Sequence, residues 1–143
     1  MFLKLKNTNE FLNAVKDILK NNDTITPGSY TRHISKQFKT MVECNNFRSL
    51  YILYLLYMEV KEVEKSSYKD ALVNNGRCLA ILSNADIGEL LGFNTTEVRT
   101  AIRKLEEFGY IENVTDFNKG AFNKTNIKVY SLTDKGYDVI ENK

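Results

Sequence analysis

The first half of the chain carries hydrophobic residues at helical spacing. Residues 9–20 predict an amphipathic helix with one apolar face, formed by Phe11, Leu12, Val15, Ile18 and Leu19. After a turn signal at Thr26-Pro27-Gly28, residues from about Thr31 to Cys44 predict a second helix. The stretch from Phe47 to about Lys65 predicts a third. It is apolar on nearly every side, so we expect it to be buried against more than one element; the alternative is that its tyrosines cover a subunit interface.

Two short helical patterns follow one another between residues 83 and 105, with almost nothing between them. Ser83 is placed to cap the first helix, and Asp86 stands three residues later, where a carboxylate favours the positive helix end. Gly88 lacks a side chain and would let a second helix approach closely. Gly92 stands where a helix often ends in the left-handed conformation. The buried face consists of three aliphatic residues, Ile87, Leu90 and Leu91.

The second pattern, from about Thr95, has two opposite faces. Its apolar stripe consists of Val98, Ala101, Ile102 and Leu105. The opposite stripe holds two long cations and two hydroxyls, Thr96, Arg99, Thr100 and Arg103. No carboxylate lies at the centre of this second stripe, because Glu97 and Glu106 fall toward its flanks. We therefore expect a helix that is buried on one side and exposes a compact cationic face.

The rest of the chain predicts short strands and a closing helix. Residues 66–77 are polar with a turn at Asn74-Asn75-Gly76, and residues 78–82 predict a short strand. Residues 110–114 and 127–132 predict two strands joined by a polar loop with a central glycine, which is typical of a hairpin with a longer loop. Residues 133–143 predict a short last helix.

Together these patterns resemble a helix-turn-helix, in which the second helix enters the major groove and the first braces it. The order "LEEFGYIEN", hairpin, "VYSLTDKG" is similar to the winged-helix version in bacterial regulators of the MarR type, over roughly residues 47–140. Winged-helix replication proteins of plasmids and phages are also similar, in "FRSLYILYLLY" and "LSNADIGELLGFNTTEVRTAIRKLEEFGYI". Both resemblances imply a mainly α fold with a small β-wing (α+β), a winged helix-turn-helix with additional N-terminal helices.

Both resemblances also imply binding to double-stranded DNA, with a recognition helix at about residues 95–108 in the major groove. Arginine can clamp a guanine edge with two hydrogen bonds, and threonine can address polar edges or thymine methyl groups. We expect Arg99 to contact bases first, and Arg103 to reach either a base or a phosphate. The complete expected set in the major groove is Thr95, Thr96, Arg99, Thr100 and Arg103.

A wing at about residues 116–126 is expected to reach the DNA backbone or the neighbouring minor groove. Its cations, Lys119, Lys124 and the following Lys128, would add affinity with little sequence information. Gly120 would let the tip of the wing turn.

We divide the chain into residues 1–46, N-terminal helices for dimerisation or packing, and residues 47–143, the DNA-binding domain. Single modules bury only about 600–1,000 Å² of protein surface on DNA, so we expect a homodimer that reads two half-sites. The alternative is that the N-terminal helices pack within their own chain. The expected function is a transcriptional regulator. The alternatives are a plasmid or phage replication-initiation protein and a winged-helix protein-interaction module.

The composition indicates a single globular domain, and the net charge of the chain neither favours nor excludes a nucleic-acid partner. The 143 residues are 43% hydrophobic and 27% charged, with a net charge of +2, so an electrostatic argument depends on local clustering. The apolar run of residues 50–58 is far short of the roughly 20 residues that cross a bilayer. The N-terminus lacks the pattern of a signal peptide, so we expect a cytoplasmic protein.

Residues that would support other chemistry are few. Cys44 and Cys78 have neither disulfide-framework nor zinc-site spacing; we interpret them as small buried hydrophobic residues, with a redox switch as the alternative. His33 is the only histidine and lies on the polar side of its expected helix, with no catalytic motif beside it. We therefore expect no enzymatic activity, no metal and no cofactor. The MarR resemblance allows a small-molecule effector, but the sequence identifies no residues for one.

Overall fold

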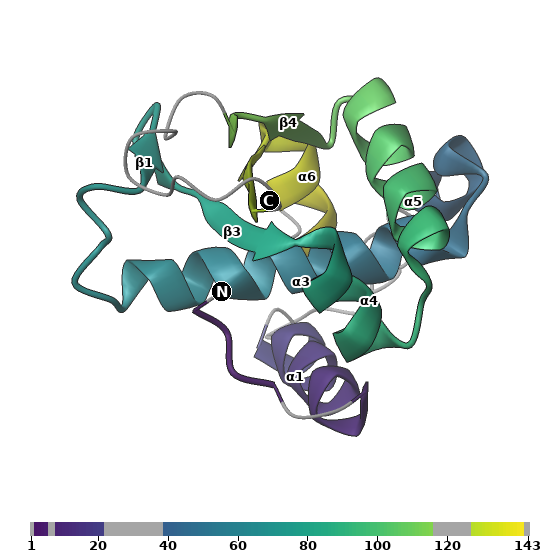
Figure 1. Cartoon of the computed structure of the whole chain (residues 1–143), viewed down its shortest axis with the longest axis horizontal. Helices are drawn as coiled ribbons and strands as arrows, with labels where there is room; N and C mark the ends of the chain where they lie inside the picture. The colour runs from purple at the N-terminus through teal and green to yellow at the C-terminus, as the bar shows by residue number, and fades with distance from the viewer. Residues whose placement is uncertain (1, 6–7, 22–38, 116–126, 142–143) are drawn as a thin grey trace.

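The computed structural model describes residues 2–5, 8–21, 39–115 and 127–141, and it combines helices with two small antiparallel sheets, an α+β fold (Figure 1). Its helices are α1 (Thr8–Asn21), α3 (Phe47–Glu64), α4 (Asn84–Leu91), α5 (Thr95–Glu107) and α6 (Asp134–Glu141). Its strands are β1 (Val73–Asn74), β2 (Arg77–Cys78), β3 (Ala80–Ser83), β4 (Ile111–Asn113) and β5 (Ile127–Leu132). Of the helix expected from residue 31 to 44, residues 39–44 are described and are helical.

Helix α3 is the central element, and its expected burial on several sides is confirmed. Every residue from Ile52 to Val60 is buried, because α5, β3, α6 and α4 pack around the helix. Tyr54 and Tyr57 are therefore core residues, whereas Tyr51 remains 38% exposed. In the part of the chain that the structure describes, no helix is both long and apolar enough to cross a membrane.

The expected hairpin of β4 and β5 is confirmed, and the turn expected at Asn74-Asn75-Gly76 joins a second hairpin, β1–β2, that was not predicted. β5 is the middle strand of a three-stranded antiparallel sheet in the order β3-β5-β4, with Ile81 opposite Val129 and Ile111 opposite Leu132. The loop between β4 and β5 includes residues 116–126, which lie outside the described residues. In the separate β1–β2 hairpin, Asn75 and Gly76 both have positive φ (53° and 77°), as a tight type I′ turn requires.

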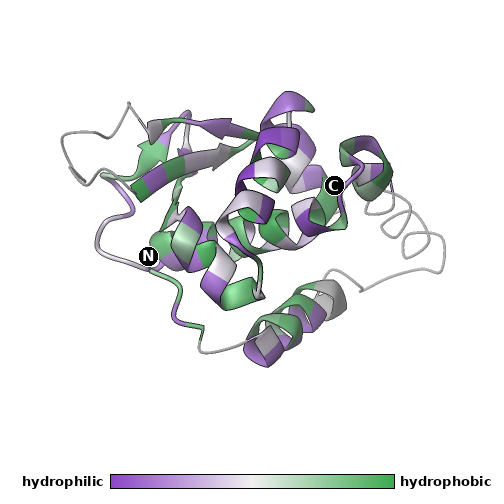
Figure 2. Ribbon diagram, turned by 45° about the vertical axis from the view of Figure 1, so that its right-hand side comes forward, coloured by the Kyte–Doolittle hydropathy of each residue, from purple (hydrophilic) through white to green (hydrophobic). Residues whose placement is uncertain are grey.

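Helix α1 packs on the body of its own chain. Phe11 is 1% exposed, and the Thr8 hydroxyl donates a hydrogen bond to the Leu90 carbonyl at 3.2 Å, which joins α1 to α4. Hydrophilic and hydrophobic residues mix along α1, as expected for a helix with one buried face (Figure 2). The prediction for Leu12 was wrong: it is 40% exposed, because it lies about 100° around the helix from Phe11 at the margin of a narrow contact. The division of the chain at residue 46 remains a prediction.

A buried carboxylate joins the N-terminal residues to α3. Glu59 is fully buried and accepts the backbone N–H of Phe2 at 2.6 Å and of Leu3 at 2.7 Å. Burial raises the pKa of the Glu59 carboxyl, and the two N–H donors oppose that shift. Both carboxylate oxygens thus hold the chain before α1 against the central helix.

Both cysteines are free and buried, which confirms their interpretation as small core residues. Burial raises the pKa of the Cys44 and Cys78 thiols. The thiolate is the reactive form, so both sites disfavour redox chemistry at neutral pH.

Candidate nucleic-acid interface

The turn between α4 and α5 is built around two glycines. The Ser83 hydroxyl caps α4 by accepting the Asp86 N–H at 3.1 Å, as predicted. At the other end, the Gly88 carbonyl accepts the N–H of Gly92 at 2.8 Å and of Phe93 at 2.9 Å, and Gly92 adopts the expected left-handed conformation with φ 76°. A Cβ at Gly88 would lie 2.5 Å from the Phe93 carbonyl oxygen. The missing side chain therefore admits the backbone of the turn, and the closest contact is not with the second helix.

Helix α5 begins with a complete capping box. The Asn94 side chain accepts the Glu97 N–H at 2.8 Å, and the Glu97 carboxylate accepts the Asn94 N–H at 2.9 Å. This reciprocal pair satisfies two backbone donors and fixes where the helix starts. The first exposed residues of α5 therefore stand at a defined position relative to the turn.

The two faces of α5 are as predicted, with the exception of Thr100. Its apolar stripe is buried, comprising Val98, Ala101, Ile102 and Leu105. Ser49 of α3 donates its hydroxyl hydrogen to the Ala101 carbonyl at 3.2 Å, which fixes α5 against the N-terminal half of α3. On the opposite side Thr100 is half-buried, while four of the predicted contact residues are exposed together: Thr95, Thr96, Arg99 and Arg103. The helix thus presents two guanidinium groups one turn apart, with hydroxyls beside them.

The acidic flanks of this face differ in their surroundings. Glu97 forms an ion pair with Arg48 at the start of α3. Arg48 was not identified from the sequence. It precedes Glu97 by 49 positions, and no local sequence pattern indicates that two residues so far apart form an ion pair. Near the end of α5, Lys104 lies 3.7 Å from the Glu107 carboxylate, and burial raises the pKa of the neighbouring Glu106 carboxyl.

The expected wing cations are only partly described. Lys119 and Lys124, with Gly120 between them, lie outside the described residues. Lys128 lies in β5 opposite Leu82 of β3 and is half-buried. Of the three wing lysines, the structure therefore places Lys128 alone, within the sheet that follows α5.

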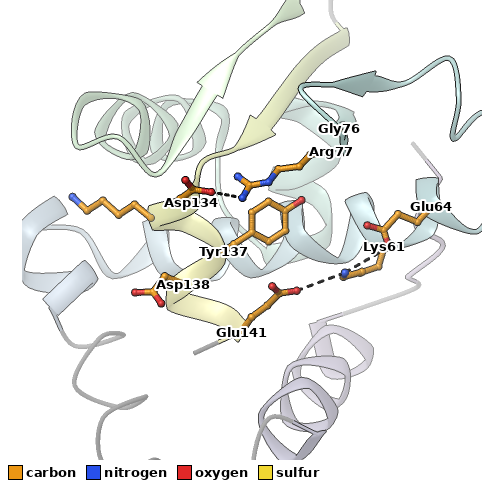
Figure 3. A pocket seen from close by; sticks show the side chains of 9 residues that line it. Lys61, Glu64, Gly76, Arg77, Asp134, Tyr137, Asp138 and Glu141 are labelled. Carbon is orange, nitrogen blue, oxygen red and sulfur yellow. Dashed lines mark hydrogen bonds and ion pairs between the residues drawn. The ribbon is translucent and has the colours of Figure 1, made fainter. Parts of the chain in front are cut away.

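A separate pocket of about 670 Å³ opens at the C-terminal end of α3, between the β1–β2 hairpin and α6 (Figure 3). Arg77 pairs with Asp134, and the Lys61 ammonium lies 3.6 Å from the Glu141 carboxylate. Burial raises the pKa of Tyr137 to about 12. The opposite charges in this pocket offset one another, and it lies far along α3 from the face of α5.

Comparisons with protein-family models, with curated proteins and with solved structures gave no match.

Proposed function

We propose that this protein binds double-stranded DNA as a winged helix-turn-helix, with α5 as the recognition helix in the major groove. One observation carries the proposal: α5 buries its apolar stripe and exposes Arg99, Arg103 and two threonines on one continuous face. Guanidinium and hydroxyl groups in that arrangement can read base edges and grip phosphates.

The element order supports the same proposal. α3, β3, α4, α5, β4 and β5 follow one another, and the β4–β5 hairpin comes directly after α5. A wing after the recognition helix would stand beside the DNA backbone, with Lys119, Lys124 and Lys128 as its cations. The short, tightly capped turn between α4 and α5 also supports a helix-turn-helix.

The biological role within this proposal is a transcriptional regulator that acts as a homodimer. A replication-initiation role would require the same duplex contacts, so it differs in context rather than in the chemistry of the site. Two copies would present two recognition helices to two half-sites, which compensates for the small surface of one module.

Fluorescence anisotropy with a labelled mixed-sequence duplex tests the proposal. We expect saturable binding that weakens on the order of 10²-fold between about 50 and 200 mM salt, if about four phosphates are neutralised. The plateau of the titration should correspond to two protomers per duplex. If the folded protein does not bind duplex at low salt, the proposal is wrong, and a protein-interaction module becomes the better account.

A further inference from the structure

Arg48 and Glu97 join the starts of the two helices that form the proposed DNA-binding surface. Arg48 lies in the first turn of α3, and Glu97 lies in the first turn of α5, where it is the only acidic residue. The Arg48 Nη2 and Glu97 Oε2 atoms form an ion pair, and each side chain is 30% exposed. This pair therefore lies at the margin of the α5 face, partly shielded from water.

The other contacts of both side chains keep the pair in one geometry. The second carboxylate oxygen of Glu97 already accepts the Asn94 N–H in the capping box. The Arg48 guanidinium lies 4.7 Å from the centre of the Phe47 ring and 5.4 Å from that of Phe93 in the turn. Within the described part of the chain, its buried Nε atom has no hydrogen-bond partner. The ion pair with Glu97 and the two ring contacts therefore position the guanidinium, while the Nε N–H adds no hydrogen bond of its own.

The charge of Glu97 matters because it lies in the first turn of α5, on the flank of the face that carries Thr96 and Arg99. An unpaired carboxylate there would add a negative charge within screening distance of the phosphates of any duplex that α5 enters, and like charges at that distance repel. Arg48 supplies an opposite charge at contact distance, from a residue outside the helix-turn-helix itself.

We propose that Arg48 is a positioning residue for the DNA-binding surface: it pairs with Glu97, cancels the only acidic charge in the first turn of α5, and holds that turn against α3. The inference rests on the proposed DNA binding. It assigns to Glu97 two structural tasks, capping and pairing, and to Arg48 an effect on DNA that operates through Glu97.

A double-mutant cycle on duplex binding tests this inference, with Arg48→Met, Glu97→Gln and the double variant. Methionine keeps the contacts with the two rings, and glutamine can keep the capping bond to the Asn94 N–H. We expect Arg48→Met to weaken binding about tenfold at low salt, because it removes one positive charge and leaves the carboxylate unpaired within screening distance of the phosphates. Glu97→Gln should tighten binding about threefold, since it leaves a net positive charge. The double variant should return to within about threefold of the wild type.

The outcomes separate this inference from the proposed function. A double variant as weak as Arg48→Met would overturn the inference, because Arg48 would then act by packing or by touching a phosphate itself. Weaker binding by the folded Glu97→Gln variant would overturn it too, and this readout remains even if Arg48→Met fails to fold. A wild-type protein that does not bind duplex would instead refute the proposed function.

Discussion

Replacing both Arg99 and Arg103 with alanine is expected to weaken duplex binding on the order of 100-fold at low salt. Both side chains are exposed on the same face of α5, one turn apart. A bidentate contact to a base is worth about 1–3 kcal/mol, and each lost phosphate contact also reduces the salt dependence by about one unit of slope. Anisotropy titrations of the variant at two salt concentrations measure both effects.

The control for this variant removes the same charge elsewhere. Lys16 of α1 and Lys69, before β1, are both exposed, and neither lies on α5. Lys16→Ala/Lys69→Ala therefore lowers the net charge by two without touching the proposed interface. We expect it to lose less than about fivefold in affinity, since only long-range attraction changes. Equal losses of affinity in the two double variants would show that binding depends on net charge, and α5 would then not be the recognition helix.

Replacing Gly88 with alanine is expected to destabilise the fold by about 2–3 kcal/mol, near the upper end of the usual range for inserting a methyl group where there is no room. The new Cβ would lie 2.5 Å from the Phe93 carbonyl oxygen, and a backbone atom can give way only if the turn itself moves. Gly88 also supplies the carbonyl that accepts both turn N–H groups. Denaturant unfolding measures the change in the free energy of unfolding.

Gly92→Ala is the matched variant in the same turn. Gly92 has φ 76°, and a Cβ there would meet nothing within 4 Å, so its cost is conformational, about 1–2 kcal/mol. Comparing the two variants separates the cost of a steric clash at residue 88 from the cost of a left-handed backbone conformation at residue 92. A loss for Gly88→Ala equal to or smaller than that for Gly92→Ala would contradict the packing described for this turn.

Helices α4 and α5 and the turn between them could be predicted closely from the sequence, because the residues that determine them are local. The spacing of Val98 and Leu105 defines which side of α5 is buried, and the cap at Ser83 and the stop at Gly92 follow from side-chain and backbone chemistry within a few residues. The turn at Asn75-Gly76 was predictable for the same reason.

Contacts between distant segments were not predictable, because periodicity says which face is buried but not what covers it. The pairing of Arg48 with Glu97 and the capture of the Phe2 and Leu3 N–H groups by Glu59 both join parts of the chain about 50 residues or more apart. The prediction that Leu12 is buried was wrong for a related reason. The surface against which α1 packs decides how wide its buried stripe is, and periodicity does not show that surface. The expected contacts of Lys119 and Lys124 lie outside the described residues and remain predictions.

Amide chemical-shift mapping of the isotope-labelled protein with duplex DNA locates the surface that DNA contacts. If α5 is the recognition helix, the largest shift changes will occur at the turn and along the exposed face of α5, from Asn94 to Arg103, with little change around Arg77 and Tyr137 in the pocket at the C-terminal end of α3. Shift changes centred on that pocket, with α5 unaffected at saturating duplex, would contradict the assignment of α5 as the recognition helix.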